Sequence, residues 1–108
     1  MLRAMDVAAP IETLLLPGSP RLAVSRSGGG GGTPALLLHG IGGNRRNWHG
    51  DLPWLARSRG VWAPDLRGYG DSESHAGPDP LAFDDLVADA ARVLAAMGTP
   101  AHVLGLSM

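Results

Sequence analysis

Residues 101–108, with the sequence AHVLGLSM, decide the fold of this chain. They begin with mainly apolar and small side chains, which is typical of a strand buried in a sheet. Gly105-Leu106-Ser107 then matches the opening of the G-x-S-x-G motif, in which a nucleophilic serine sits on a strained turn between a strand and a helix. The sequence ends one residue after this serine, before the closing glycine and the helix. We therefore expect the N-terminal piece of a longer enzyme.

Further strands are indicated upstream of this stretch. Residues 11–16 and 21–26 are two short strand patterns joined by a P-G-S-P turn. Residues 35–38 form a continuous apolar run, as expected of a strand covered on both faces, and residues 61–63 form a second, shorter one. The glycine run at 28–32 lacks the G-K-S/T and G-x-G-x-x-G spacings of nucleotide-binding loops. We interpret it as a flexible hairpin connection.

Two helix patterns separate the later strands. Residues 44–58 have apolar side chains at helical spacing, but Pro53 lies inside the segment, so we expect a broken or late-starting helix capped by Asp51. The second helix should begin at Asp79, an N-cap acid followed by proline, and it should end at Gly98. Its apolar face consists of Phe83, Leu86, Val87, Ala90, Val93, Leu94 and Met97.

The order of these patterns predicts an α/β fold. Two antiparallel strands come first, and parallel strands with flanking helices follow them. In such sheets, functional sites lie at the carboxyl ends of the parallel strands. His39-Gly40, Asp65 and Ser107 each follow one of those strands, so we expect them to meet on one rim of the sheet.

Composition narrows the classes of function. The chain has 108 residues with 9 basic and 10 acidic side chains, and its net charge of −1 gives no sign of a nucleic-acid or membrane partner. It contains no cysteine, which excludes disulfides, thiolate catalysis and thiolate metal sites. The longest apolar run near the N-terminus, residues 14–16, is too short for a signal segment or a membrane span. We expect a cytoplasmic protein without cofactor or metal, and leave its oligomeric state open.

Three loop motifs follow the predicted strands. Residues 39–43 (HGIGG) fit the pattern HGxGG, residues 64–72 (PDLRGYGDS) fit DxRGxGxS, and residues 105–108 (GLSM) fit the start of the serine elbow. Together and in this order they resemble the loops of the α/β-hydrolase family, and the resemblance covers nearly everything from residue 35 onward. It implies that residues 1–108 are the N-terminal portion of a single α/β-hydrolase domain. The later strands, the lid, and the acid and histidine of the catalytic triad would then follow this portion.

The resemblance also implies roles for residues at the rim. Ser107 is the nucleophile, and an adjacent histidine must take its proton before it attacks a carbonyl carbon. The backbone N–H groups of Ile41 and Met108 are the implied donors to the oxyanion that forms. Gly40 lets the backbone of its loop approach closely. His39 braces this loop through hydrogen bonds, and the catalytic histidine comes later in the sequence.

The remaining polar and aromatic residues receive structural interpretations. By the same resemblance, Asp65 fixes its own loop, since the family's triad acid follows a later strand. Two residues of that loop have the same interpretation, Arg67 and Asp71. Three histidines are interpreted as solvated or as satisfied by neighbours: His49, His75 and His102. Tyr69 is expected to pack against the sheet, whereas Trp48 could line an acyl pocket or pack.

The implied activity is hydrolysis of a small-molecule carboxylic ester or lactone through an acyl-enzyme. The GLSM sequence is similar to the 3-oxoadipate enol-lactonase branch. Carbon–carbon bond hydrolases and cofactor-free haloperoxidases share the same loops and stay open as alternatives. Haloalkane dehalogenases and epoxide hydrolases are disfavoured, because they resemble this chain but place aspartate where Ser107 stands. An alternative from another class is a hydrolase-like binding or signalling protein with little or no turnover.

The 108-residue chain by itself is predicted to lack triad-dependent esterase activity. Residues 101–106 would present an apolar, unpaired strand edge, which favours aggregation. The elbow would also lack the helix whose packing and N-terminal dipole hold its strained turn.

Overall fold

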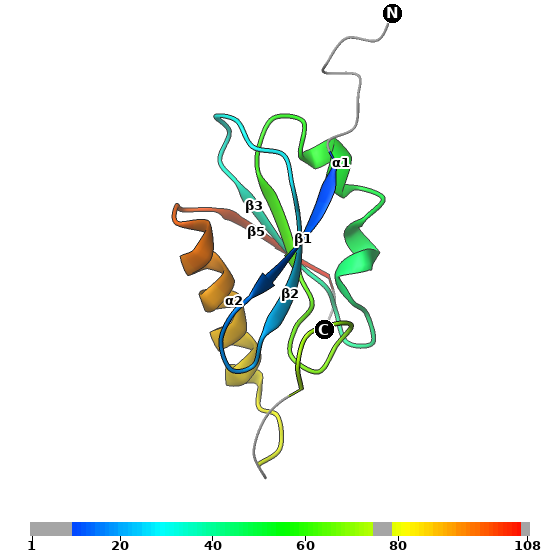
Figure 1. The fold of residues 1–108 in the computed structure, drawn as a ribbon, viewed down its shortest axis with the longest axis vertical. Helices are drawn as coiled ribbons and strands as arrows, with labels where there is room; N and C mark the ends of the chain where they lie inside the picture. Colours follow the sequence, from blue (N-terminus) through cyan, green and yellow to red (C-terminus); the bar gives the residue numbers. More distant parts are fainter. Residues whose placement is uncertain (1–9, 75–78, 107–108) are drawn as a thin grey trace, which may run out of the picture.

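The computed structural model describes residues 10–74 and 79–106, and these form one five-stranded sheet in the order β1-β2-β4-β3-β5 (Figure 1). The strands are β1 (Ile11–Leu16), β2 (Leu22–Ser27), β3 (Ala35–Leu38), β4 (Val61–Pro64) and β5 (His102–Gly105). Strand β2 pairs antiparallel with β1 and β4, whereas β3 pairs parallel with β4 and β5. The predicted α/β fold, with antiparallel strands first and parallel strands after them, is confirmed.

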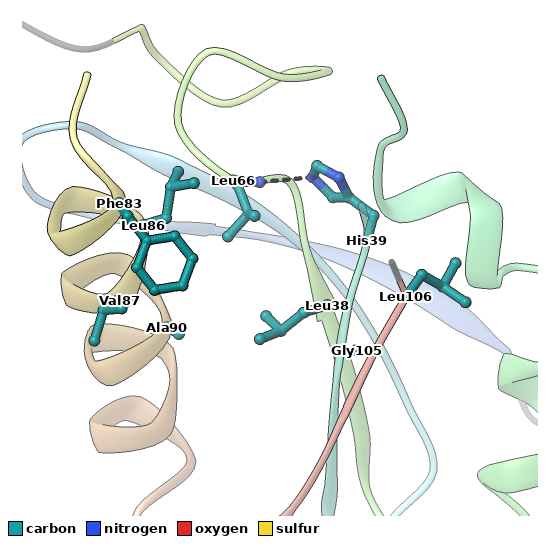
Figure 2. A pocket seen from close by; sticks show the side chains of 9 residues that line it. All are labelled: Leu38, His39, Leu66, Phe83, Leu86, Val87, Ala90, Gly105 and Leu106. Atoms are coloured by element: carbon teal, nitrogen blue, oxygen red, sulfur yellow. Dashed lines mark hydrogen bonds between the residues drawn. The ribbon is translucent and has the colours of Figure 1, made fainter. Parts of the chain in front are cut away.

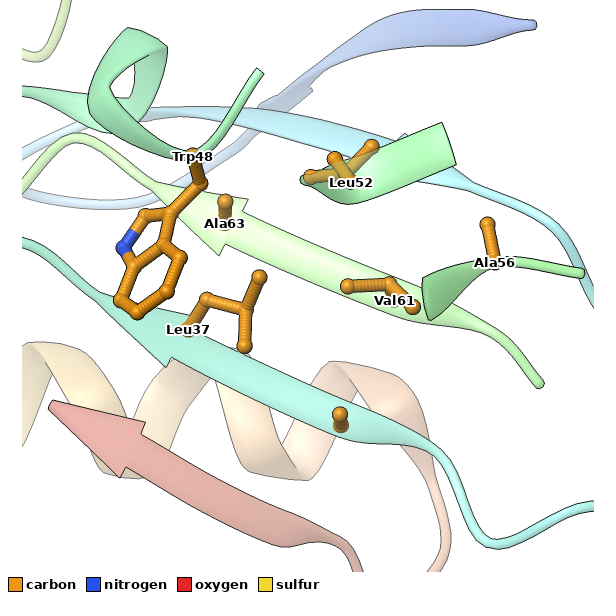
Figure 3. Packing of buried hydrophobic residues seen from close by; sticks show 7 residues of the cluster. Leu37, Trp48, Leu52, Ala56, Val61 and Ala63 are labelled. Atoms are coloured by element: carbon orange, nitrogen blue, oxygen red, sulfur yellow. The ribbon is translucent and has the colours of Figure 1, made fainter. Parts of the chain in front are cut away.

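Helical segments cover the two faces of this sheet. They are η2 (Arg45–Trp48), α1 (Leu52–Leu55) and α2 (Phe83–Met97). Helix α2 lies on one face, while η2 and α1 lie on the other (Figure 1). Because successive side chains of a strand point to opposite faces, Leu36 packs in a cluster with Val93 of α2, and Leu37 packs with Trp48 and Leu52 on the other side (Figure 3).

The segment from 44 to 58 is broken, as its proline predicted. It contains a short 3-10 turn, η2, followed by one turn of α-helix, α1, with proline in its first turn. Asp51 occupies the N-cap position of α1, but its side chain makes no capping hydrogen bond, so that part of the prediction is wrong. Capping occurs instead at η2, where the Asn44 side-chain oxygen accepts a hydrogen bond from the Arg46 N–H at 2.9 Å.

Helix α2 begins at Phe83, later than the predicted start at Asp79. The carboxylate of Asp85 accepts a hydrogen bond from the Ala82 N–H at 2.9 Å, so the helix is capped from within its own first turn. Its end is as predicted, because Gly98 adopts a left-handed φ of 76° and its N–H donates to the Leu94 carbonyl.

The glycine run at 28–32 is not a hairpin connection. It joins β2 to β3, and these strands are not neighbours, because β4 lies between them. The run passes beside the segment that follows α1, where the Gly32 N–H donates to the Ser58 carbonyl at 3.2 Å. Gly28 has a positive φ of 76°, and a Cβ there would collide with the Ala56 backbone. Its glycine is therefore explained by close backbone packing.

Strand β5 lies at the edge of the sheet formed by the described residues, as expected. Its apolar side chains are largely uncovered, and Leu104 is 44% exposed. On the neighbouring helix α2, Phe83 is 67% exposed. Within residues 10–74 and 79–106, none of the helices combines the length and apolar character that crossing a membrane requires.

Candidate active site

The carboxyl ends of β3, β4 and β5 lie along one rim of the sheet (Figure 1). Leu38 pairs with Gly105 across β3 and β5, and the Leu106 N–H donates to the Leu38 carbonyl at 3.0 Å. His39 follows Leu38 directly, so the HGIGG loop starts beside the end of β5. The two residues after Leu106, Ser107 and Met108, lie outside the described residues. The structure therefore describes the residues that lead into the predicted elbow, Gly105 and Leu106, but not the serine itself.

His39 is fully buried and holds two rim loops together (Figure 2). Its Nε2 lies 3.0 Å from the Leu66 backbone nitrogen, which can only donate, so Nε2 is the acceptor and carries no proton. The other ring nitrogen, Nδ1, is then protonated and donates to the Gly40 carbonyl at 2.9 Å. The Tyr69 ring packs edge-on, with its centroid 4.9 Å from that of the imidazole. Since both ring nitrogens are engaged, neither is available to take a proton from a serine.

The Asp65 carboxylate accepts several hydrogen bonds that hold the loop after β4 in place. Its buried carboxylate accepts hydrogen bonds from the backbone N–H groups of Arg45 at 2.7 Å and Asp71 at 2.9 Å. It also pairs with the Arg45 guanidinium. Gly70 passes directly over this carboxylate with a positive φ of 51°, and a Cβ there would collide with it. The loop that follows β4 is therefore built around the Asp65 side chain.

Arg45 was not singled out by the sequence, yet it joins more elements than any other rim side chain described above. Its buried guanidinium contacts Asp65, donates to the Asp71 carboxylate at 2.8 Å, and donates through Nε to the Ser25 hydroxyl of β2 at 2.9 Å. Burial would lower the pKa of Arg45, but the hydrogen bonds to Asp71 and Asp65 raise it above its ordinary value. The same contact with Arg45 lowers the pKa of Asp71.

A second buried arginine ties the loop after β4 to helix α2. Arg67 donates through Nε and a terminal nitrogen to the two carboxylate oxygens of Asp89, at 2.8 and 2.7 Å. Asp89 is fully buried, and these hydrogen bonds raise the pKa of Arg67. The sequence could have indicated that Asp89 is buried, because at helical spacing it lies beside the apolar face of α2 and not in the middle of its polar face. Arg45 and Ser25 gave no such signal.

The loop after β3 makes a tight, glycine-rich turn. The Gly43 N–H donates to the Gly40 carbonyl at 3.0 Å, and Gly42 has a positive φ of 81°. Ile41 lies at the tip of this turn and is 71% exposed. None of the hydrogen bonds among residues 10–74 and 79–106 uses the Ile41 N–H as a donor. Among the described residues, that N–H therefore has no hydrogen-bond partner.

An apolar pocket of about 190 Å³ lies below the rim, between α2 and the sheet (Figure 2). Its lining consists of Leu38, His39, Leu66, Phe83, Leu86, Val87, Ala90, Gly105 and Leu106. Apart from the His39 ring, these side chains offer no polar group to a ligand. The pocket adjoins the end of β5 and is lined on its other side by apolar residues of α2. Its apolar lining suits an apolar partner better than a polar substrate.

The remaining aromatic and histidine residues have packing or hydrogen-bonding roles. Trp48 is buried among Leu37 and its neighbours, so of its two interpretations packing is the one the structure shows (Figure 3). The Nε2 atom of His49 is hydrogen-bonded to the Ser25 hydroxyl at 2.7 Å, and the same hydroxyl accepts from Arg45. Burial, together with the charges of Arg45 and Arg46, lowers the pKa of His49. His102 is exposed on β5, and His75 lies outside the described residues.

No group of three or more acidic or histidine side chains within the described residues is placed to hold a metal ion.

A model of the alpha/beta hydrolase family matches residues 35–108. The chain is 38% identical over 104 residues to the dihydrolipoyllysine-residue acetyltransferase component of the acetoin cleaving system of Cupriavidus necator, covering 95% of this chain and 27% of that protein. It is 50% identical over 44 residues to the soluble epoxide hydrolase of Corynebacterium sp. strain C12, covering 41% of this chain and 15% of that protein.

The fold is shared with solved structures as well. A mutant of an enzyme described as a "putative epoxide hydrolase" from Pseudomonas aeruginosa superposes with a TM-score of 0.78 at 34% identity, covering 90% of this chain and 32% of the other. The chain thus spans about a third or less of the proteins that it matches.

Proposed function

Because the chain belongs to the alpha/beta hydrolase family, we propose that the whole protein is a serine hydrolase that cleaves a carboxylic ester or lactone. The observation that carries the proposal is that Ser107 occupies the G-x-S position in the sequence, two residues after the end of β5 at Gly105. The neighbouring rim loops, which contain His39 and Asp65, are hydrogen-bonded to each other. Residues 1–108 would supply the nucleophile and both oxyanion donors, while the general base would come from outside them.

The proposed reaction proceeds through an acyl-enzyme. The Ser107 hydroxyl gives its proton to a histidine supplied by the rest of the protein, and its oxygen attacks the carbonyl carbon. The oxyanion that develops accepts hydrogen bonds from the Ile41 and Met108 N–H groups. Collapse of this intermediate breaks the ester C–O bond, and the leaving alkoxide takes the proton from the histidine. Water then attacks the acyl-enzyme by the same route, which releases the acid and restores Ser107.

The rest of the protein would also complete the hydrophobic core. The apolar pocket beside α2 adjoins Gly105 and Leu106, so the helix expected after Ser107 could enter it directly. The exposed side of β5 would pair with a later strand. We propose that both apolar surfaces are internal packing surfaces of a single domain, of which residues 1–108 form the N-terminal portion.

A specific observation favours one second candidate. The relative matched over 95% of this chain is named as an acetyltransferase component. The same acyl-enzyme could pass its acyl group to a thiol or an alcohol instead of water. The two candidates differ in the acceptor, and the partition of the acyl group between water and an added thiol distinguishes them.

The proposal is tested with the full-length protein and its Ser107→Ala variant. We expect a fluorophosphonate probe to label the protein on Ser107, and activated esters or lactones to be hydrolysed by the wild type but not by the variant. The 108-residue chain should show no stoichiometric labelling, since it lacks a base. Unchanged ester hydrolysis in the Ser107→Ala variant would exclude a serine nucleophile. An active epoxide hydrolase without probe labelling would overturn the ester assignment, and an inactive full-length protein would favour a binding role.

A further inference from the structure

We infer that Arg45 is a positioning residue that fixes the direction of the Ile41 N–H, an inference that rests on the proposed oxyanion role of that group. Residues 39–45 form a short bridge whose two ends are both fastened to the loop after β4. At one end, His39 accepts a hydrogen bond from the Leu66 N–H at 3.0 Å. At the other end, the Arg45 N–H donates to the Asp65 carboxylate at 2.7 Å. The two anchor points are consecutive residues, and Ile41 lies between the fastened ends.

The turn inside this bridge makes few other fastening contacts. It is closed by the Gly43–Gly40 hydrogen bond and by the Asn44 N–H, which donates to the Asn47 side chain at 2.8 Å. Both contacts are within residues 40–47, so they define the shape of the turn but not its orientation relative to the sheet. The orientation of the Ile41 N–H relative to the sheet therefore depends on the two ends. Losing one of them would leave the turn free to rotate about the other.

The Arg45 side chain strengthens its end of the bridge in a way that lysine could not reproduce. The guanidinium binds Asp65 and Asp71 of one loop and Ser25 of β2 at once, which needs several donors in a fixed planar arrangement. Asp65 and Arg45 are both buried, so their pairing is shielded from salt and water. A lysine would keep the charge but would have to give up the Ser25 contact or one of the carboxylates.

Arg67 provides a matched control. It is also a buried arginine paired with a buried aspartate, and it also fastens the loop after β4. Its partner Asp89 lies on α2, however, whereas Arg45 is itself the last residue of the 39–45 bridge and fastens that end to Asp65. Substitution of either arginine should destabilise the fold. Only substitution of Arg45 should misdirect Ile41.

The test uses the full-length protein with four variants: Arg45→Lys, Arg45→Met, Arg67→Lys and Arg67→Met. Measured quantities are kcat and KM for an activated ester, and inhibition constants for a tetrahedral boronic-acid analogue and for the carboxylate product. The Arg45→Met variant should lose kcat on the order of 10²-fold, the loss expected from a small misplacement of a catalytic group. Its affinity for the boronic acid should fall in proportion, while KM and product inhibition should change little. Arg67→Met should retain kcat below its unfolding temperature.

Several outcomes overturn the inference. One is an equal loss of kcat in the Arg45 and Arg67 variants, and another is an equal loss of affinity for the boronic acid and the product. If Arg45→Met does not fold, Arg45→Lys decides, with an amide NMR shift of the Ile41 N–H expected in that variant and absent from Arg67→Lys. A wild-type protein that neither cleaves esters nor reacts with a fluorophosphonate would instead refute the proposed function, and this inference with it.

Discussion

The polar rim and the apolar flank of this molecule differ in one respect: polar side chains at the rim are hydrogen-bonded or ion-paired, whereas apolar side chains on the flank remain exposed. By the rim we mean the loops 39–45 and 64–72, and by the flank we mean β5 together with Phe83 and Val87 of α2. At the rim, buried charges are paired and both His39 nitrogens are bonded. On the flank, apolar side chains remain exposed, although the pocket between α2 and β5 could receive further apolar groups.

The difference shows that the two kinds of interaction depend on different things. The contacts that fasten the rim come from β2, η2 and the two loops, and all of those named above lie within the described residues. Apolar burial depends instead on what lies against a surface, and it scales with the area covered. A chain spanning about a third of a matched structure thus contains a paired polar network beside exposed apolar side chains.

The largest effect should come from breaking the rim at Asp65. Replacing Asp65 by Asn removes the buried charge that faces Arg45, and the other carboxylate, Asp71, is too exposed to replace it. Leaving a buried charge without its partner costs roughly 3–5 kcal/mol. Urea unfolding of the full-length protein measures this loss. Asp71→Asn is the matched control and should cost far less; equal losses would show that the buried carboxylate is not the fastening point.

A smaller effect should separate the finished core from the flank. Leu36 is fully buried against α2, so Leu36→Ala should cost roughly 2–5 kcal/mol in any version of the protein that folds. Leu104 is partly exposed on β5, so Leu104→Ala should cost under about 0.5 kcal/mol in the 108-residue chain.

In the full-length protein, Leu104→Ala should become nearly as costly as Leu36→Ala if later elements cover the flank. Urea unfolding of both variants in both versions provides the comparison. A Leu104→Ala effect that stays small in the full-length protein would mean that this flank is never covered. Should the 108-residue chain aggregate instead of folding, the expected open edge of β5 is the first explanation to test.

The sequence predicted the parts of the fold that depend on local patterns. The strand at residues 35–38 followed from a continuous apolar run, and the end of α2 followed from Gly98. The predicted start of α2 was wrong, because an N-cap was assigned to Asp79, whereas the helix starts after Ala82, whose N–H donates to the Asp85 carboxylate inside the helix. The hairpin at the glycine run was wrong because composition predicts a connection but not which strands it leaves adjacent.

At the rim, motifs predicted positions and spacing but not the partners of side chains. His39 and Asp65 were singled out because they belong to recognisable loops. Arg45 was not, since one arginine in an arginine-rich segment carries no pattern, and its partners Ser25 and Asp65 lie 20 residues away on either side. Contacts of this kind arise only when the sheet brings β2 and the end of β4 together.

The smallest expected effect is a pH dependence of stability at the edge of the rim, where His49 is hydrogen-bonded to Ser25. Burial and the nearby Arg45 and Arg46 lower its pKa in the folded state below the ordinary 6.5, and Asp65 opposes this only in part. As the pH falls below about 6.5, the unfolded chain therefore binds the proton first, and stability decreases until the folded-state pKa is passed. Above that pH, His49 is neutral in both states and has no effect.

Urea midpoints measured between pH 7.5 and about pH 5 should fall for the wild type, and His49→Gln should remove part of this slope while leaving the midpoint at high pH nearly unchanged. His102→Gln, on the exposed β5 flank, is the control and should leave the slope intact. The lowered pKa of Asp71 acts in a separate window: its stabilisation is present above the ordinary value of 3.8 and is lost as the pH falls further. If the urea midpoint of His49→Gln depends on pH as strongly as that of the wild type, protonation of His49 does not affect stability. The stabilising contacts of the rim would then be its arginine–carboxylate pairs.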